Sequence, residues 1–391
     1  MRNRLIALTA LAVTAALLPA PPAAARLGPT WIVGPDFSSP PGTTGAEWRD
    51  VTATGPADVW ALGVLRNPTD NPLTAHWDGK SWTAVPISNP STTLRYDLTA
   101  VDAVASGEAW VVGSAVSATR TALMLHYNGA WTAVPLPQQP KGQESVLADI
   151  DMSATGGWAV GYTSSADKPS RALIERRLGA DWVEVAVPGT DATATELSAV
   201  YAHAADDAWA VGSQVRIDGR RTALILHWDG GSWREQVPTE IEGLGEEVFL
   251  TSVSASTADD VWAVGRICSG DGVESCRPLV LHPSGGAWKP VPLAGNETEL
   301  TEVLAFSPTD VWVVGYAGDW LTLETDSAEH WDGHRFTPDA DVLSTPGDGV
   351  LDGEPGSALS AATKIPGTGA IWAVGWTRDP VRGATHVVRR G

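Results

Sequence analysis

The stretch Asp260-Val261-Trp262-Ala263-Val264-Gly265 decides the fold, because its centre, Trp-Ala/Val-Val/Leu-Gly, occurs seven times along the chain. The seven tryptophans are separated by 50, 48, 51, 53, 50 and 60 residues. They are Trp60, Trp110, Trp158, Trp209, Trp262, Trp312 and Trp372. A recurring period of this length is typical of architectures that stack one supersecondary unit many times. We therefore expect seven similar units.

Each unit contains four short apolar segments that indicate strands. The first begins about ten residues before the tryptophan, usually with a leucine such as Leu98, and the second carries the motif. The third ends near an Asp-Gly or Asn-Gly pair such as Asp229-Gly230, which forms a tight hairpin turn because both residues tolerate positive φ. The fourth opens with an aromatic residue such as Trp233 and ends near Val237-Pro238, where proline fits an outer strand.

One such four-stranded sheet cannot bury both of its faces. Stacking the sheets radially buries them, and closing the ring limits exposed strand edges. The sequence therefore predicts an all-β fold, a seven-bladed β-propeller with four antiparallel strands per blade. We expect it to form one domain over residues 26–391.

The two ends of the chain predict how the ring closes. The seventh unit stops after its third strand, around residues 386–389, and lacks a fourth. Residues 30–35, Thr-Trp-Ile-Val-Gly-Pro, match the fourth strand of the first unit at 81–86, Ser-Trp-Thr-Ala-Val-Pro. We therefore expect the N-terminal strand to complete the last blade.

The first 25 residues have the pattern of a signal peptide. Arg2 and Arg4 precede an apolar run over 5–18, and the alanines at 23–25 provide a cleavage site. We expect cleavage after Ala25 and a secreted, extracellular protein. No later segment approaches about 20 continuous apolar residues, so we expect no membrane insertion. The mature protein is expected to be a monomer.

The charge and the cysteines agree with an exported protein. The chain has 46 acidic and 26 basic side chains, a formal net charge of −20, which disfavours nucleic-acid partners. Solubility is the simpler reason for such acidity. Cys268 and Cys276 are the two cysteines, and so close a pair is expected to form a disulfide in an oxidising compartment. It would close a short loop and contribute about 2–3 kcal/mol.

The combination of Asp-Val-Trp-Ala-Val-Gly at 260–265, His-Trp-Asp-Gly at 227–230 and Ser-Trp at 232–233 resembles kelch-like repeats. It is similar to the galactose-oxidase-like propeller repeat proteins that actinobacteria export. The resemblance implies a propeller fold. A copper–radical oxidase of the galactose-oxidase type would need two tyrosines, two histidines and a thioether cysteine that converge on one face. This chain has five tyrosines, and both of its cysteines lie in one loop, so the resemblance transfers no copper ligand. We expect no cofactor and no bound metal.

Five histidines occupy one position of the repeat, near the end of the third strand. They are His76, His126, His227, His282 and His330. Recurrence at equivalent places around a ring indicates an architectural role rather than a catalytic cluster.

Two hypotheses for function remain. The loops after the second and fourth strands vary most and share one face, and variable loops on a rigid scaffold often carry function. An aromatic and acidic patch on this face could stack a sugar, a peptide side chain or a cation. Its residues are Trp48, Trp320, Trp376, Asp319, Tyr316 and Arg378. Alternatively, Trp48 simply replaces the usual leucine in the core, and the acids are solvated.

The first hypothesis is a secreted binding or scaffold protein for an extracellular peptide, glycan or protein. The second is an extracellular hydrolase or lyase with acid–base carboxylates at the mouth of the central funnel. Asp50, Asp149 and Glu302 lie near the starts of their first strands and are the candidate catalytic residues. The residues favour the first hypothesis and leave catalysis open.

Overall fold

A computed structural model describes most of the chain after its N-terminal region. The described residues are 31–33, 37, 45–67, 69–88, 94–153, 156–188, 194–236, 247–269, 276–295, 299–318, 325–339, 356–377 and 385–390. Every regular element within these ranges is a β-strand. None of these residues belongs to a helix with the length and apolar character of a membrane span. The expected signal peptide, residues 1–25, lies outside the described residues.

The strands pair into seven four-stranded antiparallel sheets, which we number as blades in chain order. Blade 1 contains β2 (Gly45–Gly55), β3 (Asp58–Asn67), β4 (Thr69–Trp77) and β5 (Trp82–Ala84). Blade 2 contains β6 (Arg95–Ala105), β7 (Glu108–Val116), β8 (Arg120–Asn128) and β9 (Trp131–Ala133). Blade 3 contains β10 (Glu144–Ser153), β11 (Gly156–Ser165), β12 (Lys168–Leu178) and β13 (Asp181–Glu184). Blade 4 contains β14 (Thr195–Ala204), β15 (Asp207–Val215), β16 (Arg221–Trp228) and β17 (Trp233–Glu235).

The second half of the ring follows the same order. Blade 5 contains β18 (Glu247–Thr257), β19 (Asp260–Cys268), β20 (Cys276–Ser284) and β21 (Ala287–Pro290). Blade 6 contains β22 (Glu299–Ser307), β23 (Asp310–Ala317), β24 (Thr325–Trp331) and β25 (Phe336–Pro338). Blade 7 contains β26 (Ser357–Lys364), β27 (Ile371–Thr377) and β28 (Thr385–Arg390), joined by β1 (Trp31–Val33).

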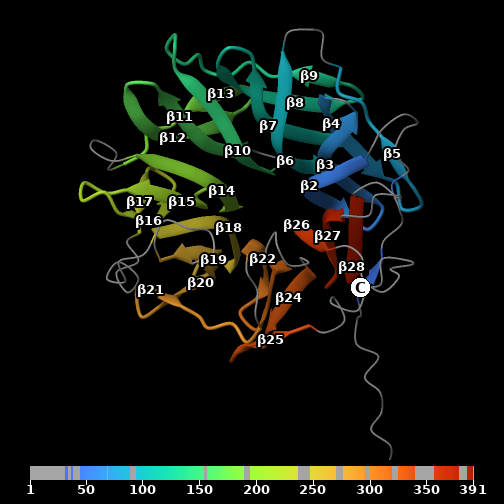
Figure 1. Ribbon diagram of the computed structural model, residues 1–391, viewed down its shortest axis with the longest axis vertical. Helices are drawn as coiled ribbons and strands as arrows, with labels where there is room; N and C mark the ends of the chain where they lie inside the picture. The colour runs from blue at the N-terminus through green and yellow to red at the C-terminus, as the bar shows by residue number, and fades with distance from the viewer. Residues whose placement is uncertain are drawn as a thin grey trace, which may run out of the picture.

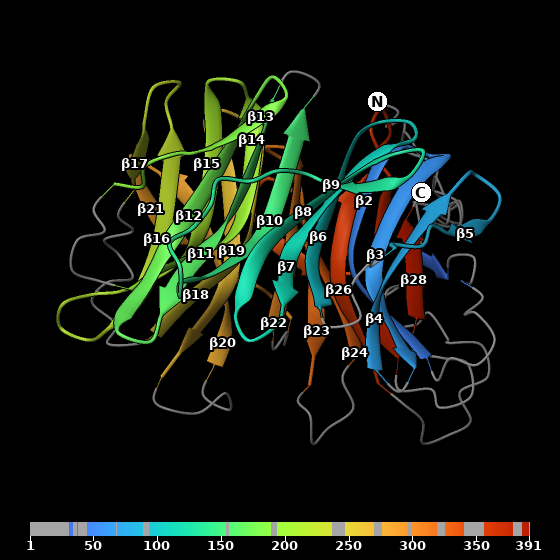
Figure 2. The ribbon, with the colours of Figure 1, turned by 90° about the horizontal axis from the view of Figure 1, so that it is seen from above.

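The blades are arranged radially, with the first strand of each innermost and the short fourth strand outermost (Figure 1). Figure 2 shows the blades edge-on, with strands running between the two faces of the ring. We call the first strands, β2, β6, β10, β14, β18, β22 and β26, the inner strands. Each inner strand starts at the face that carries the variable loops, which we call the loop face, and ends at the opposite turn face. This order confirms the predicted propeller of four-stranded antiparallel blades.

The two ends of the chain meet in one sheet, as the sequence predicts. β1 pairs with β28 in antiparallel register, with Trp31 opposite Arg390 and Val33 opposite Val388. The N-terminal strand therefore supplies the outermost strand of blade 7. This pairing joins strands from opposite ends of the chain and closes the ring.

Aromatic side chains hold neighbouring blades together. The motif tryptophan in the second strand of each blade packs against the aromatic residue of the fourth strand in the next blade. The pairs and their centroid distances are Trp60–Trp131 (5.9 Å), Trp110–Trp182 (6.0 Å), Trp158–Trp233 (4.9 Å), Trp209–Trp288 (5.6 Å), Trp262–Phe336 (5.8 Å), Trp312–Trp31 (6.2 Å) and Trp372–Trp82 (5.6 Å). The motif tryptophans are at most 7% exposed. Because large buried rings dominate core energetics, these contacts explain why the motif recurs once per blade.

The motif glycine is required by a close approach of two strands. Opposite this residue the inner strand carries a β-bulge, for example between Trp48 and Asp50. A Cβ atom added at Gly63 would lie 2.2 Å from the carbonyl oxygen of Glu47, and one at Gly265 would lie 2.0 Å from that of Phe249. Across the seven motif glycines this distance is 1.9–2.2 Å, closer than any side chain tolerates.

The five repeated histidines pack against the motif tryptophans of their own blades. In blade 4 the rings of His227 and Trp209 are 4.1 Å apart, and His227 Nε2 lies 2.8 Å from Asp207 Oδ1. The other four have the same type of tryptophan and carboxylate partners. These contacts fit the predicted architectural role.

Candidate functional site

The inner strands surround a central channel with a cavity of about 500 Å³. It extends from Arg49, near the loop face, to Lys364 and Pro366, near the turn face. All seven inner strands contribute to its wall, and Figure 1 shows these strands around the centre of the ring. The channel is therefore the place where side chains from every blade can act together.

Carboxyl groups line this channel in two tiers. Asp50, Asp149 and Glu302 occupy one repeat position, just after the bulge and opposite the residue that precedes the motif glycine. Asp102 and Asp151 lie two positions further along, opposite the motif tryptophan of their blades. The first tier is thus closer to the loop face. Because alternate residues of a strand point to the same side, both tiers line the cavity.

The sequence-based candidates Asp50, Asp149 and Glu302 thus lie on the channel wall. Asp102, Asp151 and Lys364 were not among the sequence-based candidates. A position-by-position comparison of the inner strands could have found the two aspartates, since each lies two residues beyond the first-tier position. Whether the three candidates act in catalysis remains a proposal.

The aspartates of the channel bond to backbone amides. The two oxygens of Asp50 accept hydrogen bonds from Val51 N (2.8 Å) and Val101 N (2.7 Å). Asp149 accepts in the same way from Ile150 N and Val200 N, both at 2.8 Å. In both Asp50 and Asp149, one accepted hydrogen bond stays within the blade and the other comes from the next blade.

Burial raises the pKa of these carboxyl groups. Each faces the channel and keeps part of its surface accessible, yet each lies deep inside the ring, where charge is poorly solvated. Burial and the charge of Asp149 raise the pKa of Asp50 to about 8. Burial also raises the pKa of Asp149 to about 7, and that of Glu302 to about 8.

The second tier shows the same effect. Burial raises the pKa of Asp102 to about 6 and that of Asp151 well above its ordinary value, with the charge of Asp102 adding to the second shift. At neutral pH the channel therefore holds both protonated and ionised carboxyl groups.

Lys364 is the cation at the turn-face end of the channel. From the end of β26 its Nζ donates to the carbonyl of Ala305 at 3.0 Å and contacts Ser254 Oγ at 3.4 Å. The same ammonium group lies 5.3 Å from the ring centroid of Tyr201. Lys364 therefore connects blade 7 with blades 4, 5 and 6 across this end. Burial lowers the pKa of Lys364, and Asp151 and Glu302 oppose that shift.

Only part of the predicted aromatic patch lies within the described residues. Trp48 is 1% exposed, and its ring lies 5.2 Å from Phe37 and 6.1 Å from Trp82. The prediction that it faces a ligand is therefore wrong, because its ring fills the leucine position of the core. Tyr316 and Trp376 are half-buried, at the loop-face ends of β23 and β27. Trp320, Asp319 and Arg378 lie outside the described residues.

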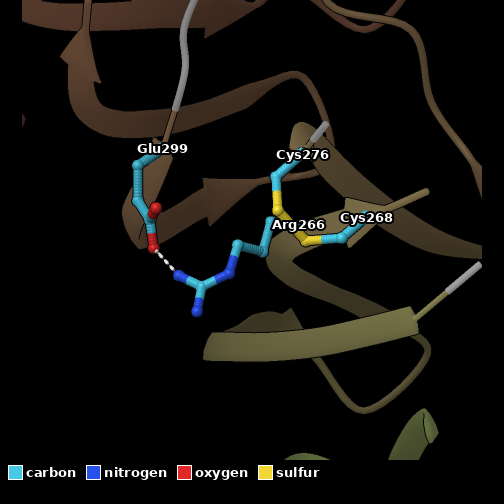
Figure 3. The surroundings of a disulfide bond; sticks show 4 residues. All are labelled: Arg266, Cys268, Cys276 and Glu299. Carbon is cyan, nitrogen blue, oxygen red and sulfur yellow. Dashed lines mark hydrogen bonds and ion pairs between the residues drawn. A yellow bond between two sulfur atoms is a disulfide. The ribbon is translucent and has the colours of Figure 1, made fainter. Parts of the chain in front are cut away.

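Ion pairs and a disulfide lie along the loop face. Arg49 Nη1 lies 2.9 Å from Asp97 Oδ1, which links blades 1 and 2. Arg266 and Glu299 link blades 5 and 6 close to the Cys268–Cys276 disulfide (Figure 3). The predicted disulfide is confirmed, and its cysteines lie directly opposite in β19 and β20. Because exposed ion pairs contribute little free energy, we expect these pairs to add little to the stability of the ring.

Within the described ranges, no group of three or more His, Cys, Asp or Glu side chains has an arrangement suited to a metal ion. The channel carboxyl groups instead direct their oxygens to backbone amides, to the hydroxyl of Thr52 or to that of Ser252.

Comparisons with known proteins identify the fold. No protein-family model matches the chain, and no curated protein matches its sequence. The lectin BP39L from Burkholderia pseudomallei aligns with a TM-score of 0.55 at 12% identity, over 89% of this chain and 96% of the lectin. YCF48 bound to D1 peptide aligns with a TM-score of 0.53 at 15% identity, over 92% of this chain and 96% of YCF48.

An ulvan lyase of polysaccharide lyase family PL25 also aligns, with a TM-score of 0.51 at 8% identity, over 92% of this chain and 94% of the lyase. At such low identity these similarities concern the fold alone. The class that fold and comparisons define is the β-propeller.

Proposed function

We propose that this protein is a binding protein whose central channel receives a cationic group of an extracellular peptide or protein. The observation that carries the proposal is the composition of the channel wall. Five carboxyl groups face one lysine among the described residues of the cavity, together with Arg49 at its rim. A nearby positive charge favours the ionised form of a carboxyl group, so a cationic ligand would lower the raised pKa values of these groups and bind to the carboxylates that form.

The channel favours a basic side chain over a sugar. Sugars usually stack on aromatic rings, and Tyr201 is the one aromatic residue in the described lining of the cavity. A lysine or arginine side chain instead needs acceptors along a narrow path. The two carboxyl tiers offer such acceptors at successive depths, and Lys364 marks the far end. Propellers of known structure include one bound to a peptide, which supports a ligand of this class.

The rim of the site belongs to the same proposal. Tyr316 and Trp376 lie where β23 and β27 reach the loop face. We keep these two residues as members of the rim that would contact the rest of the ligand, together with the sequence-based members Trp320, Asp319 and Arg378.

Titration calorimetry with hexalysine, hexa-arginine, hexaglutamate and cellohexaose tests this function. The two basic peptides should bind, and the other two should not. Asp102→Asn with Asp151→Asn should weaken hexalysine binding about tenfold or more, which corresponds to about 1.4 kcal/mol. Asp181→Asn, an exposed acid on β13, is the matched control and should leave binding unchanged. An equal loss of hexalysine affinity in both variants would mean that the peptide binds through the general surface charge and not in the channel.

One observation favours an enzyme as the second candidate. Asp50, Asp149 and Glu302 have pKa values of about 8, 7 and 8, so they keep protons near neutral pH, as a general acid must. An extracellular hydrolase or lyase would use them on a polysaccharide. The test is release of reducing ends or unsaturated products from a polysaccharide panel. Activity that Asp149→Asn abolishes would establish this function, and a panel without turnover would leave these carboxyl groups without a catalytic role.

Export is part of the proposal as well. The Cys268–Cys276 disulfide fits an oxidising compartment. N-terminal sequencing of protein recovered from the culture medium should begin at Arg26, directly after the expected signal peptide. Protein that retains Met1 inside the cell would contradict export.

A further inference from the structure

Side chains of one inner strand accept hydrogen bonds from backbone amides of the next. In the arc from β2 to β14 the acceptors are carboxyl groups. Asp50 accepts from Val101 N at 2.7 Å, Asp102 from Met152 N at 2.6 Å, Asp149 from Val200 N at 2.8 Å and Asp151 from Ala202 N at 2.9 Å. We call this part of the ring, β2, β6, β10 and β14, the acidic arc. Four carboxyl bridges thus join its inner strands.

Hydroxyl groups make the equivalent bridges elsewhere. Between β18 and β22, Ser254 Oγ accepts from Ala305 N at 3.2 Å, and Ser252 Oγ accepts from Val303 N at 3.3 Å. Ser254 occupies the repeat position of Asp102 and Asp151, opposite the motif tryptophan. The ring therefore contains the same bridge in two chemical forms, one that ionises and one that does not.

The bridges of the acidic arc sit in a shared electrostatic environment. Asp50 faces the charges of Asp149 and Asp102, and Asp151 faces those of Asp102, Asp149 and Lys364. The other titratable or charged groups of the channel are Glu302 on β22, Tyr201 on β14, Lys364 on β26 and Arg49 on β2. Within this set Lys364 is at the turn-face end and Arg49 at the rim, so the carboxyl groups in between have little compensating charge.

Deprotonation of these aspartates should therefore weaken the contacts between the inner strands of the acidic arc. An ionised carboxylate is a stronger acceptor for its amide, yet it lies in a poorly solvated channel beside others of the same charge. The raised pKa values of Asp50, Asp102, Asp149 and Asp151 mean that burial and repulsion outweigh the stronger hydrogen bonds. Water entering between two inner strands would solvate the charge and break the bridge.

We propose that the acidic arc is a proton-dependent fastener, which holds the inner strands of blades 1 to 4 together at low pH and loosens them as pH rises. The Ser254–Ala305 bridge between blades 5 and 6 has no carboxyl partner and stays closed over the same range. The ring thereby opens on one side only. This inference does not depend on the ligand proposed for the channel.

Amide hydrogen exchange resolved by residue tests the proposal, because three amides occupy equivalent positions. Met152 and Ala202 donate to carboxyl groups, whereas Ala305 donates to Ser254. For a group with raised pKa, the opening equilibrium grows about tenfold per pH unit between its ordinary and raised values. After correction for intrinsic exchange, protection of Met152 should fall about tenfold between pH 5 and pH 7, and protection of Val200 about 50-fold. Protection of Ala305 should stay constant.

Three variants complete the test. Asp102→Asn keeps an acceptor but cannot ionise, so protection of Met152 should lose its pH dependence while that of Val200 keeps it. Asp149→Asn should have the reverse effect and serves if the first variant does not fold. Ser254→Ala is the matched control and should lower protection of Ala305 equally at both pH values. Equal pH dependence at Met152, Val200 and Ala305 would overturn the proposal, as would protection in the arc that increases with pH.

Discussion

We predict that ionisation of Glu175 lowers the stability of the outer part of blade 3 as pH rises. Its side chain on β12 is 1% exposed, its Oε2 is buried without a hydrogen-bond partner, and Glu184 lies directly opposite on β13. Burial, with the charge of Glu184 as a second cause, raises the pKa of Glu175 from 4.5 to about 8. A folded-state pKa above the unfolded one means that stability falls as pH rises, here between about 4.5 and about 8.

The size of the effect follows from the shift. One pH unit corresponds to about 1.4 kcal/mol, so full ionisation of Glu175 costs on the order of 3–5 kcal/mol of folding free energy. Glu175→Gln removes the charge at nearly constant volume. At pH 8 it should stabilise the protein by a large part of that amount, and at pH 4.5 it should change little. Chemical denaturation at both pH values measures the difference.

A matched control is available in blade 6. Glu329 occupies the same repeat position, opposite the residue after the motif tryptophan, but its carboxylate accepts from Ala294 N at 3.0 Å and Gly295 N at 2.7 Å. In the connection before blade 3, Pro137 stands at the place of Ala294 and has no N–H to donate. Glu329→Gln should therefore destabilise by about 1–3 kcal/mol at neutral pH. A Glu175→Gln variant that is equally or less stable than the wild type at pH 8 would refute this reasoning.

Three further perturbations probe other parts of the ring. Gly265→Ala should cost about 1–3 kcal/mol or more in thermal or chemical denaturation, because the added Cβ would meet the Phe249 carbonyl. Gly369→Ala, where no atom lies within 4 Å and φ is not positive, is its control and should cost less. Trp31→Ala should lower stability by about 3–5 kcal/mol, since its ring packs on Trp312, and unchanged stability would remove β1 from the core. Reduction of Cys268–Cys276 should lower stability by about 2–3 kcal/mol while circular dichroism stays that of a β protein; loss of the whole fold would contradict a local role.

The repeat made the architecture predictable, because each recurring feature of the motif has one structural role. The tryptophan of Trp262-Ala-Val-Gly fills the space between blades, and the glycine makes room for the bulged inner strand. The match of residues 30–35 to 81–86 predicted the pairing of β1 with β28, because a missing outer strand must be supplied from somewhere.

The site was harder to predict, because bridges between blades leave no local pattern. Asp50, Asp149 and Glu302 could be placed at the starts of inner strands. The sequence did not indicate that the oxygens of Asp50 and Asp149 would accept from amides some 50 residues away in the next blade. For Trp48, by contrast, the sequence suggested a role that the structure does not support. The predicted patch gave it a ligand contact, whereas its repeat position, shared with Leu98, is a core position. Position in the repeat was therefore a better guide than residue type.

The measurement that tests the central claim most directly is an experimental structure of the protein with hexalysine. We predict a lysine side chain inside the ring, entering from the loop face, with its ammonium group within hydrogen-bond distance of Asp102 or Asp151. A peptide bound on the outer strands, with the channel unchanged, would contradict it.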